Sequence, residues 1–118
     1  MSESASQRIT AEVTSWPGVE SGFGDRGEFG FNVGRRQIGH LHGDRVAHFV
    51  FPPELGAGLR AAGRIGPHPV APEKPAWGAR PIASDEDVAD VIALMRMNYD
   101  RVIERYGVPE AAGVDPAA

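Results

Sequence analysis

The sequence predicts a single α+β domain: an antiparallel β-meander of about four to five strands with helices packed on one face. Glycine-centred turn signals separate short apolar runs between residues 19 and 51, which is typical of consecutive hairpins. An apolar stripe with helical period occupies residues 85–106. A length of 118 residues suits one domain. The expected order of elements is α-β-β-β-β-α-β-α.

The first helix is expected at residues 5–15. Ile9 and Val13 lie one helical turn apart, so they share a face, and Pro17-Gly18 ends the pattern.

Two further helices follow the meander. The run Pro52-Pro53-Glu54 is typical of a helix start, because proline suits the first turn. Ser84, followed by three acidic residues, is typical of an N-cap and a first turn that favour the helix dipole. The apolar stripe then predicts a helix over 85–106. The domain is expected to cover 1–106, with 107–118 as a flexible C-terminal tail.

Strands are expected at residues 19–23, 28–33, 36–42, 45–51 and 77–83. Gly34 and Gly43 each fit the first central position of a two-residue type II′ turn. These turns predict the pairs Val33–Arg36, Phe31–Ile38, Phe29–His40, His42–Arg45, His40–Ala47 and Ile38–Phe49. The proline-rich stretch 63–76 is unsuited to an interior strand and is expected to form an extended loop that carries His68.

Two histidines, His40 and His42, lie two positions apart in a predicted strand, so both rings point to one face of the sheet. In the predicted register this is the apolar face of Phe29 and Phe49, which packs against the helices. A slip of one residue would reverse that assignment.

The His-X-His spacing allows both imidazoles to reach one metal ion. Asp44 and His68 are the remaining candidates for a third ligand, whereas Arg45 beside His42 would repel a cation. Two other interpretations remain open: rings hydrogen-bonded within the core or a pocket wall, and rings that contact an anionic or polar ligand. The candidate ligand-binding residues are His40, His42, Arg36, Arg45, His68, Trp77 and Arg80.

The composition excludes several classes of function. With no cysteine, the chain has no disulfide, thiolate-bound metal or cysteine nucleophile. A net charge of −4 without a basic run argues against nucleic acid as a partner. No apolar run is long enough to span a membrane, and the N-terminus lacks the apolar core of a secretory signal, so a cytoplasmic location is expected.

Several short segments together resemble the family of small bacterial proteins called the luciferase domain. They are Ser15-Trp16-Pro17-Gly18-Val19, Ile38-Gly39-His40-Leu41-His42-Gly43, Phe51-Pro52, Pro67-His68, Trp77 and Ser84-Asp85-Glu86-Asp87-Val88. The resemblance covers about residues 10–106, and the Gly-His-Leu-His-Gly run is its most specific part. The order of elements also resembles YjbR-type α+β domains, although the residues do not carry that likeness.

The resemblance implies a small-molecule pocket but no catalytic residues. It does not imply light emission, because flavin-dependent luciferases use a barrel of roughly 250 residues. The leading hypothesis is a small-molecule-binding domain with its pocket around Gly39–Gly43. One alternative is a metal- or cofactor-assisted oxidoreductase that uses His40 and His42, and another is a YjbR-like interaction or DNA-binding domain. The sequence identifies no ligand, cofactor, reaction or oligomeric state.

Overall fold

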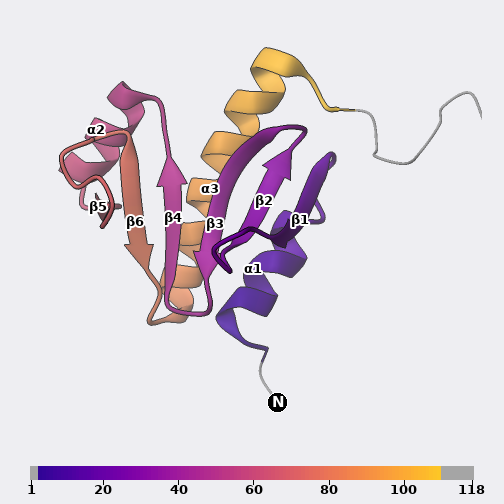
Figure 1. Ribbon diagram of the computed structural model, residues 1–118, viewed down its shortest axis with the longest axis horizontal. Helices are drawn as coiled ribbons and strands as arrows, with labels where there is room; N and C mark the ends of the chain where they lie inside the picture. Colours follow the sequence, from indigo (N-terminus) through magenta and orange to yellow (C-terminus); the bar gives the residue numbers. More distant parts are fainter. Residues whose placement is uncertain (1–2, 110–118) are drawn as a thin grey trace, which may run out of the picture.

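The computed structural model describes residues 3–109 and shows three helices and a six-stranded sheet (Figure 1). The helices are α1 (Ala5–Val13), α2 (Pro53–Ala61) and α3 (Asp85–Tyr106). The strands are β1 (Val19–Phe23), β2 (Phe29–Val33), β3 (Arg36–His42), β4 (Val46–Val50), β5 (Gly66–Pro67) and β6 (Trp77–Pro81). Their order across the sheet is β1-β2-β3-β4-β6-β5, and every neighbouring pair is antiparallel. The predicted α+β class and meander are confirmed. The predicted tail lies, from residue 110 onward, outside the described residues.

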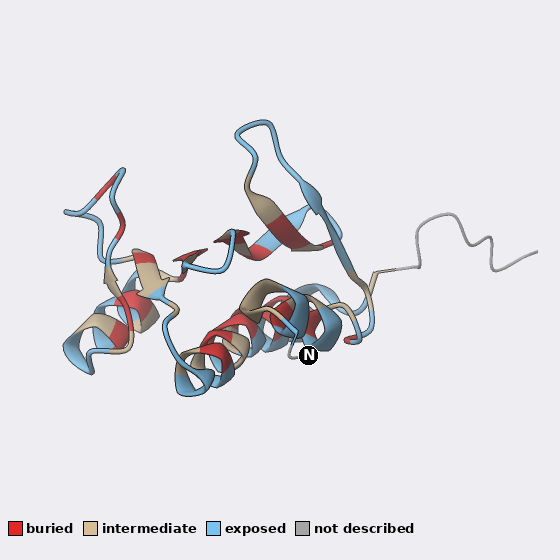
Figure 2. Cartoon of the chain, turned by 90° about the horizontal axis from the view of Figure 1, so that it is seen from below, coloured by how far each residue is buried: buried red, intermediate tan, exposed pale blue. Residues whose placement is uncertain are grey.

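Helices α1 and α3 cover one face of the sheet, and none of the helices within residues 3–109 lies over the opposite face (Figure 2). The core lies between these two layers. Ile9 of α1 and Met95 of α3 are fully buried there, together with Phe31 of β2 and Phe49 of β4, which is 2% exposed. None of the helices in residues 3–109 combines the length and the apolar character that crossing a bilayer requires.

The proline-rich stretch is mostly a loop, as predicted, and α2 holds it in place. The Arg60 guanidinium donates hydrogen bonds to the carbonyls of Pro72, Lys74 and Trp77 at 2.9, 3.0 and 3.3 Å. The two-residue strand β5 was not predicted, and it pairs with β6 at the edge of the sheet. An edge position tolerates Pro67, because proline has no N–H to donate.

A β-bulge at Ile38 changes the register between β2 and β3. The observed pairs are Val33–Arg36, Asn32–Gln37, Phe31–Gly39, Gly30–His40 and Phe29–Leu41. The pair nearest the turn is as predicted, but the predicted Phe31–Ile38 and Phe29–His40 pairs are wrong, because Ile38 is an additional residue on β3.

The turn between β3 and β4 also differs from the prediction. The observed pairs are His40–His48, Leu41–Ala47 and His42–Val46. The turn therefore contains three residues, Gly43-Asp44-Arg45, rather than two. The predicted His42–Arg45, His40–Ala47 and Ile38–Phe49 pairs are accordingly wrong by one residue.

These shifts place the histidines of β3 on the opposite face from the one predicted. Leu41, between them, is 1% exposed and packs in the core, so His40 and His42 point to the face without helices. The prediction that they share a face with Phe29 and Phe49 is wrong. The prediction that the two rings share one face is confirmed.

The pairing of β3 with β4 covers three pairs of residues and stops at His40 and His48. Beyond that point, the side chain of Asn98 in α3 bridges the two strands. This side chain is fully buried, and Nδ2 donates to the carbonyls of Ile38 and Val50 at 3.2 and 3.1 Å. The amide thus satisfies the carbonyl that the bulge removes from the β-ladder. A buried carbonyl without a partner would cost the full desolvation of that group.

Replacing Asn98 with leucine should lower the free energy of unfolding by about 1–3 kcal/mol, because the Ile38 carbonyl loses its donor inside the core. Urea denaturation measures the loss, and faster amide hydrogen exchange in β3 and β4 should accompany it. A loss below about 0.5 kcal/mol would show that the bulge does not depend on this amide.

A side chain at position 39 should overpack the core, since an added Cβ would lie 2.5 Å from Met95 Sδ and 2.9 Å from Phe49 Cε1. Gly39→Ala is expected to cost about 1–3 kcal/mol through overpacking. The matched control is Gly58→Ala in α2, where nothing lies within 4 Å and the change should stabilise the helix by up to about 1 kcal/mol. Equal effects of the two substitutions on urea unfolding would contradict this packing.

Candidate functional site

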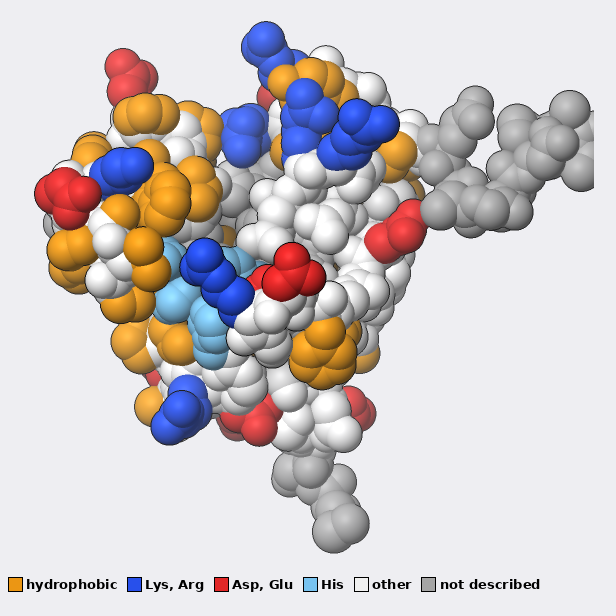
Figure 3. All heavy atoms as spheres, viewed as in Figure 1, with side chains coloured by type: hydrophobic (Ala, Val, Ile, Leu, Met, Phe, Trp, Pro, Cys, Tyr) orange, Lys and Arg blue, Asp and Glu red, His pale blue; other side chains and the backbone are white. Residues whose placement is uncertain are grey.

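The helix-free face of the sheet is hollowed by a cavity of about 540 Å³, here called the histidine trough. It is lined by Asp25, Arg26, Glu28, Gln37, His40, His42, His48, His68, Pro69 and Val70. The turn between β1 and β2 forms one wall, and the loop after β5 forms the other. Figure 3 shows the histidine side chains in the hollow between a hydrophobic group and charged side chains. All four histidines of the chain therefore meet in one place.

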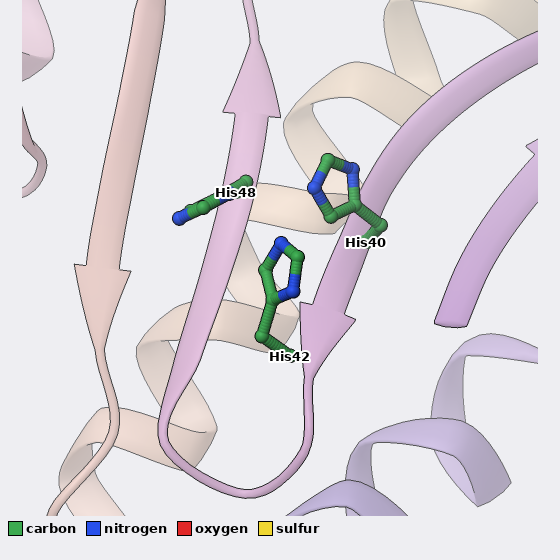
Figure 4. A group of neighbouring side chains, drawn as sticks. All are labelled: His40, His42 and His48. Carbon is green, nitrogen blue, oxygen red and sulfur yellow. The ribbon is translucent and has the colours of Figure 1, made fainter. Parts of the chain in front are cut away.

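Strands β3 and β4 provide three of these histidines. His40 and His42 lie two residues apart on β3, so they point to the same face, and His48 of β4 is paired with His40 (Figure 4). The ring centroids are 5.0 Å apart for His40 and His42, 5.2 Å for His40 and His48, and 4.6 Å for His42 and His48. One nitrogen from each ring can be chosen so that all three lie within 4.8 Å of one another. The three residues could together hold a metal ion.

His68 comes from the loop after β5 and extends the row. The centroid of its ring lies 4.3 Å from that of His48 and 5.3 Å from that of Trp77, and His68 is 7% exposed. The backbone N–H of Val70 donates to His68 Nδ1 at 3.1 Å. In the neutral ring this bond leaves the proton on Nε2.

Gln37 makes the only side-chain hydrogen bond to the rings of the three strand histidines within residues 3–109. Its Oε1 lies 2.7 Å from His40 Nδ1. Residues 37 and 40 would point to opposite faces of a regular strand, and the bulge at Ile38 brings both into the trough. Gly30, opposite His40, leaves room for this contact, because a Cβ there would lie 2.8 Å from Gln37 Nε2.

Comparison with known families identifies the chain. The family model of the luciferase domain matches residues 35–98, which is more than half of the 118 residues. The chain belongs to the luciferase-domain family. The match runs from Arg35, one residue before β3, to Asn98 and includes all four histidines, whereas the β1–β2 wall lies outside it. No curated protein and no solved structure matches the chain.

The electrostatics of this luciferase domain favour neutral imidazoles in the trough. Burial, reinforced by His68, His42 and His40, lowers the pKa of His48 to about 4. Burial also lowers the pKa of His40, with His42 acting in the same direction and Glu28 opposing it. The pKa of His68 is lowered by burial and by His42. His48 is therefore neutral at pH 7, with a lone pair available on its ring.

The structure brings some of the predicted candidates together and separates others. His40, His42 and His68 line the trough, and Trp77 lies behind His68. The predicted arginines Arg36, Arg45 and Arg80 do not line the trough. Asp44, a candidate third ligand, instead accepts a hydrogen bond from the Ser6 N–H at 2.8 Å in the β3–β4 turn.

Each of the three arginines has another place in the fold. Arg36 stacks on the Tyr106 ring with its Cζ 3.5 Å from the ring centroid. Arg45 is exposed in the turn and its carbonyl accepts the Ile82 N–H at 2.8 Å. Arg80 faces the helices, where it forms an ion pair with Asp87 at 2.7 Å.

Sequence reasoning missed His48, because the predicted register placed it on the other face from His40. A signal for the correct register was present. When His40 pairs with His48, the three strand histidines share one face, and Leu41, Ala47 and Phe49 share the other. That arrangement separates polar from apolar side chains better than the predicted one. The wall residues of the β1–β2 turn, which the sequence marks only as a turn, were also missed.

Acidification should destabilise the metal-free domain between about pH 6.5 and pH 4. Unfolded His48 takes up a proton near pH 6.5, but folded His48 does so only near pH 4, so the unfolded state binds more protons in this window. Stability is complete above the window and falls as the pH falls through it, by on the order of 3 kcal/mol for this residue. His40 and His68 act in the same direction.

Urea unfolding of chelator-treated protein across this pH range measures the effect. His48→Gln should remove much of the dependence, since glutamine does not titrate. An unchanged pH profile in this variant would show that His48 is not the residue responsible.

Proposed function

We propose that this luciferase domain binds a small molecule in the histidine trough. The observation that carries the proposal is the convergence of every histidine of the chain in one open cavity, on the face that none of the three described helices covers. Ligand sites are typically concave, with a few convergent polar groups on an otherwise apolar scaffold. A volume of about 540 Å³ lies within the range of such sites.

The hydrogen bonding of the rings supports a ligand rather than a purely structural role. Histidines that serve the core are expected to have their ring nitrogens paired with protein groups. Within residues 3–109, the side chains of His42 and His48 form no hydrogen bond to another residue, although His48 is only 8% exposed. Their nitrogens remain available to a molecule in the trough.

The lining suggests an amphipathic ligand. On the floor, Gln37 and the strand histidines offer donors and acceptors to a polar group, and Arg26 offers donors from the β1–β2 wall. On the loop wall, Pro69 and Val70 offer apolar surface, and Val70 is 68% exposed. A polar end would lie on the histidines, with an apolar part against the loop.

The other hypotheses receive less support. The trough provides histidines for an oxidoreductase, but the residues indicate no particular redox reaction. For a DNA-binding domain, both the net charge of −4 and the acidic side chains of Asp25 and Glu28 on the wall are unfavourable.

An NMR titration of metal-free, ¹⁵N-labelled protein with a fragment mixture of small carboxylates, phenols and amides tests the proposal. The expected shifts lie at the backbone amides of His40, His42, His48 and Val70. Val70→Trp should weaken fragment binding by about tenfold, because the larger ring fills the trough. Val108→Trp, at another exposed valine, is the matched control and should have no effect.

A different map of shifts would refute the proposal. The competing location is the apolar cavity of about 440 Å³ between α1 and the β1–β2 turn, lined in part by Thr10, Phe23 and Phe29. Shifts confined to that cavity, or equal losses in both tryptophan variants, would place the ligand site elsewhere.

A further inference from the structure

We propose that His40, His42 and His48 form a binding site for a divalent transition-metal ion, and that Gln37 positions His40 for it. This inference deepens the proposed function and rests on it for the location of the ligand, since the metal would anchor that ligand in the trough. Metal binding can nevertheless be measured without any small molecule.

The donor set is already assembled by two neighbouring strands. The three nitrogens lie within 4.8 Å of one another, whereas nitrogens bound tetrahedrally to one zinc ion lie about 3.4 Å apart. Metal binding therefore requires rotations of the histidine side chains that bring the nitrogens closer by up to about 1.4 Å. Because β3 and β4 share the core through Leu41 and Ala47, the floor that carries the ligands is fixed.

Gln37 determines which nitrogen of His40 faces the metal. When the Gln37 amide oxygen accepts the hydrogen bond at 2.7 Å, His40 Nδ1 carries the proton and Nε2 presents its lone pair. Metal-bound histidines commonly have this kind of partner on the other ring nitrogen. The bulge at Ile38 and the missing Cβ of Gly30 are what allow Gln37 to reach the ring.

His68 is not a ligand in this arrangement. Its Nδ1 accepts the Val70 N–H, so its Nε2 carries the proton and has no lone pair to offer. The protein therefore provides three ligands and leaves at least one coordination position open to the trough. Three protein ligands with an open position are typical of zinc sites that act on a bound molecule.

The chemistry of the donors selects the class of metal. Three imidazoles, without thiolate or carboxylate in the set, suit zinc, cobalt, nickel, copper or iron rather than calcium or magnesium. The surrounding charge is compatible with a cation, because Asp25 and Glu28 outweigh Arg26 in the lining. Arg45, which the sequence suggested would repel a cation, does not line the trough.

The test uses the full chain, purified without a histidine tag and treated with chelator. Calorimetric titration with Zn²⁺, and the visible absorption of added Co²⁺, should show one ion per chain. His48→Gln should weaken Zn²⁺ binding at least about 100-fold, and Gln37→Leu about 10- to 100-fold, with recovery in Gln37→Glu, whose carboxylate also accepts from Nδ1. Asp44→Asn is the matched control and should retain the wild-type affinity, since Asp44 is engaged by Ser6.

A second measurement keeps the inference testable if a variant fails to fold. Long-range ¹H–¹⁵N spectra of the wild-type protein should show Zn²⁺ on Nε2 of His40, with Nδ1 protonated, and no zinc on His68.

Absence of stoichiometric binding, or coordination by His68 in place of His48, would overturn the site. Equal affinity in Gln37→Leu and the wild type would overturn the positioning role alone. If fragments bind in the trough but no metal ion binds, the proposed function stands and the metal inference falls; if a metal ion binds but fragments do not, the reverse holds.

Discussion

The bulge at Ile38 is the constraint on which the rest of the structure depends. One additional residue on β3 changes which side chains face the helices for the remainder of the strand. Leu41 enters the core, and the two histidines beside it turn to the open face. Without the bulge, the same sequence would bury imidazoles against α3 and expose a leucine. The candidate site exists because the strand is irregular at this one position.

A bulge needs compensation, and α3 provides it. Asn98 donates to the Ile38 carbonyl, and Gly39 gives Met95 and Phe49 the space that a side chain would occupy. These contacts link residues far apart in the chain, so no local pattern reveals them. The polar amide inside an otherwise apolar helix face is explained by the strand that it supports.

The sequence predicted the fold well wherever a local signal determined the structure. The helix over 85–106 follows from its capping serine, acidic first turn and apolar stripe, and the structure shows it with the same limits. Between β2 and β3 the register was predicted correctly only as far as the bulge, which no local signal marks. Between β3 and β4 it was wrong from the turn onward, because Gly43 is compatible with more than one turn length. His40, His42 and His68 were identified as candidates. His48 and Gln37 were not, since their proximity to His40 depends on a register that the tertiary contacts decide.

Arg60 anchors the loop after β5 through its guanidinium group. This anchoring determines the course of one wall of the trough without determining which side chains that wall presents. The hydrogen bonds that the Arg60 side chain donates here all go to backbone carbonyls, those of Pro72 and Lys74 in the loop and of Trp77 at the start of β6. Such anchoring is indifferent to the side chains that the loop carries. Residues on this wall can therefore be exchanged while the wall keeps its course, so the path of the loop and the side chains that it presents can vary independently.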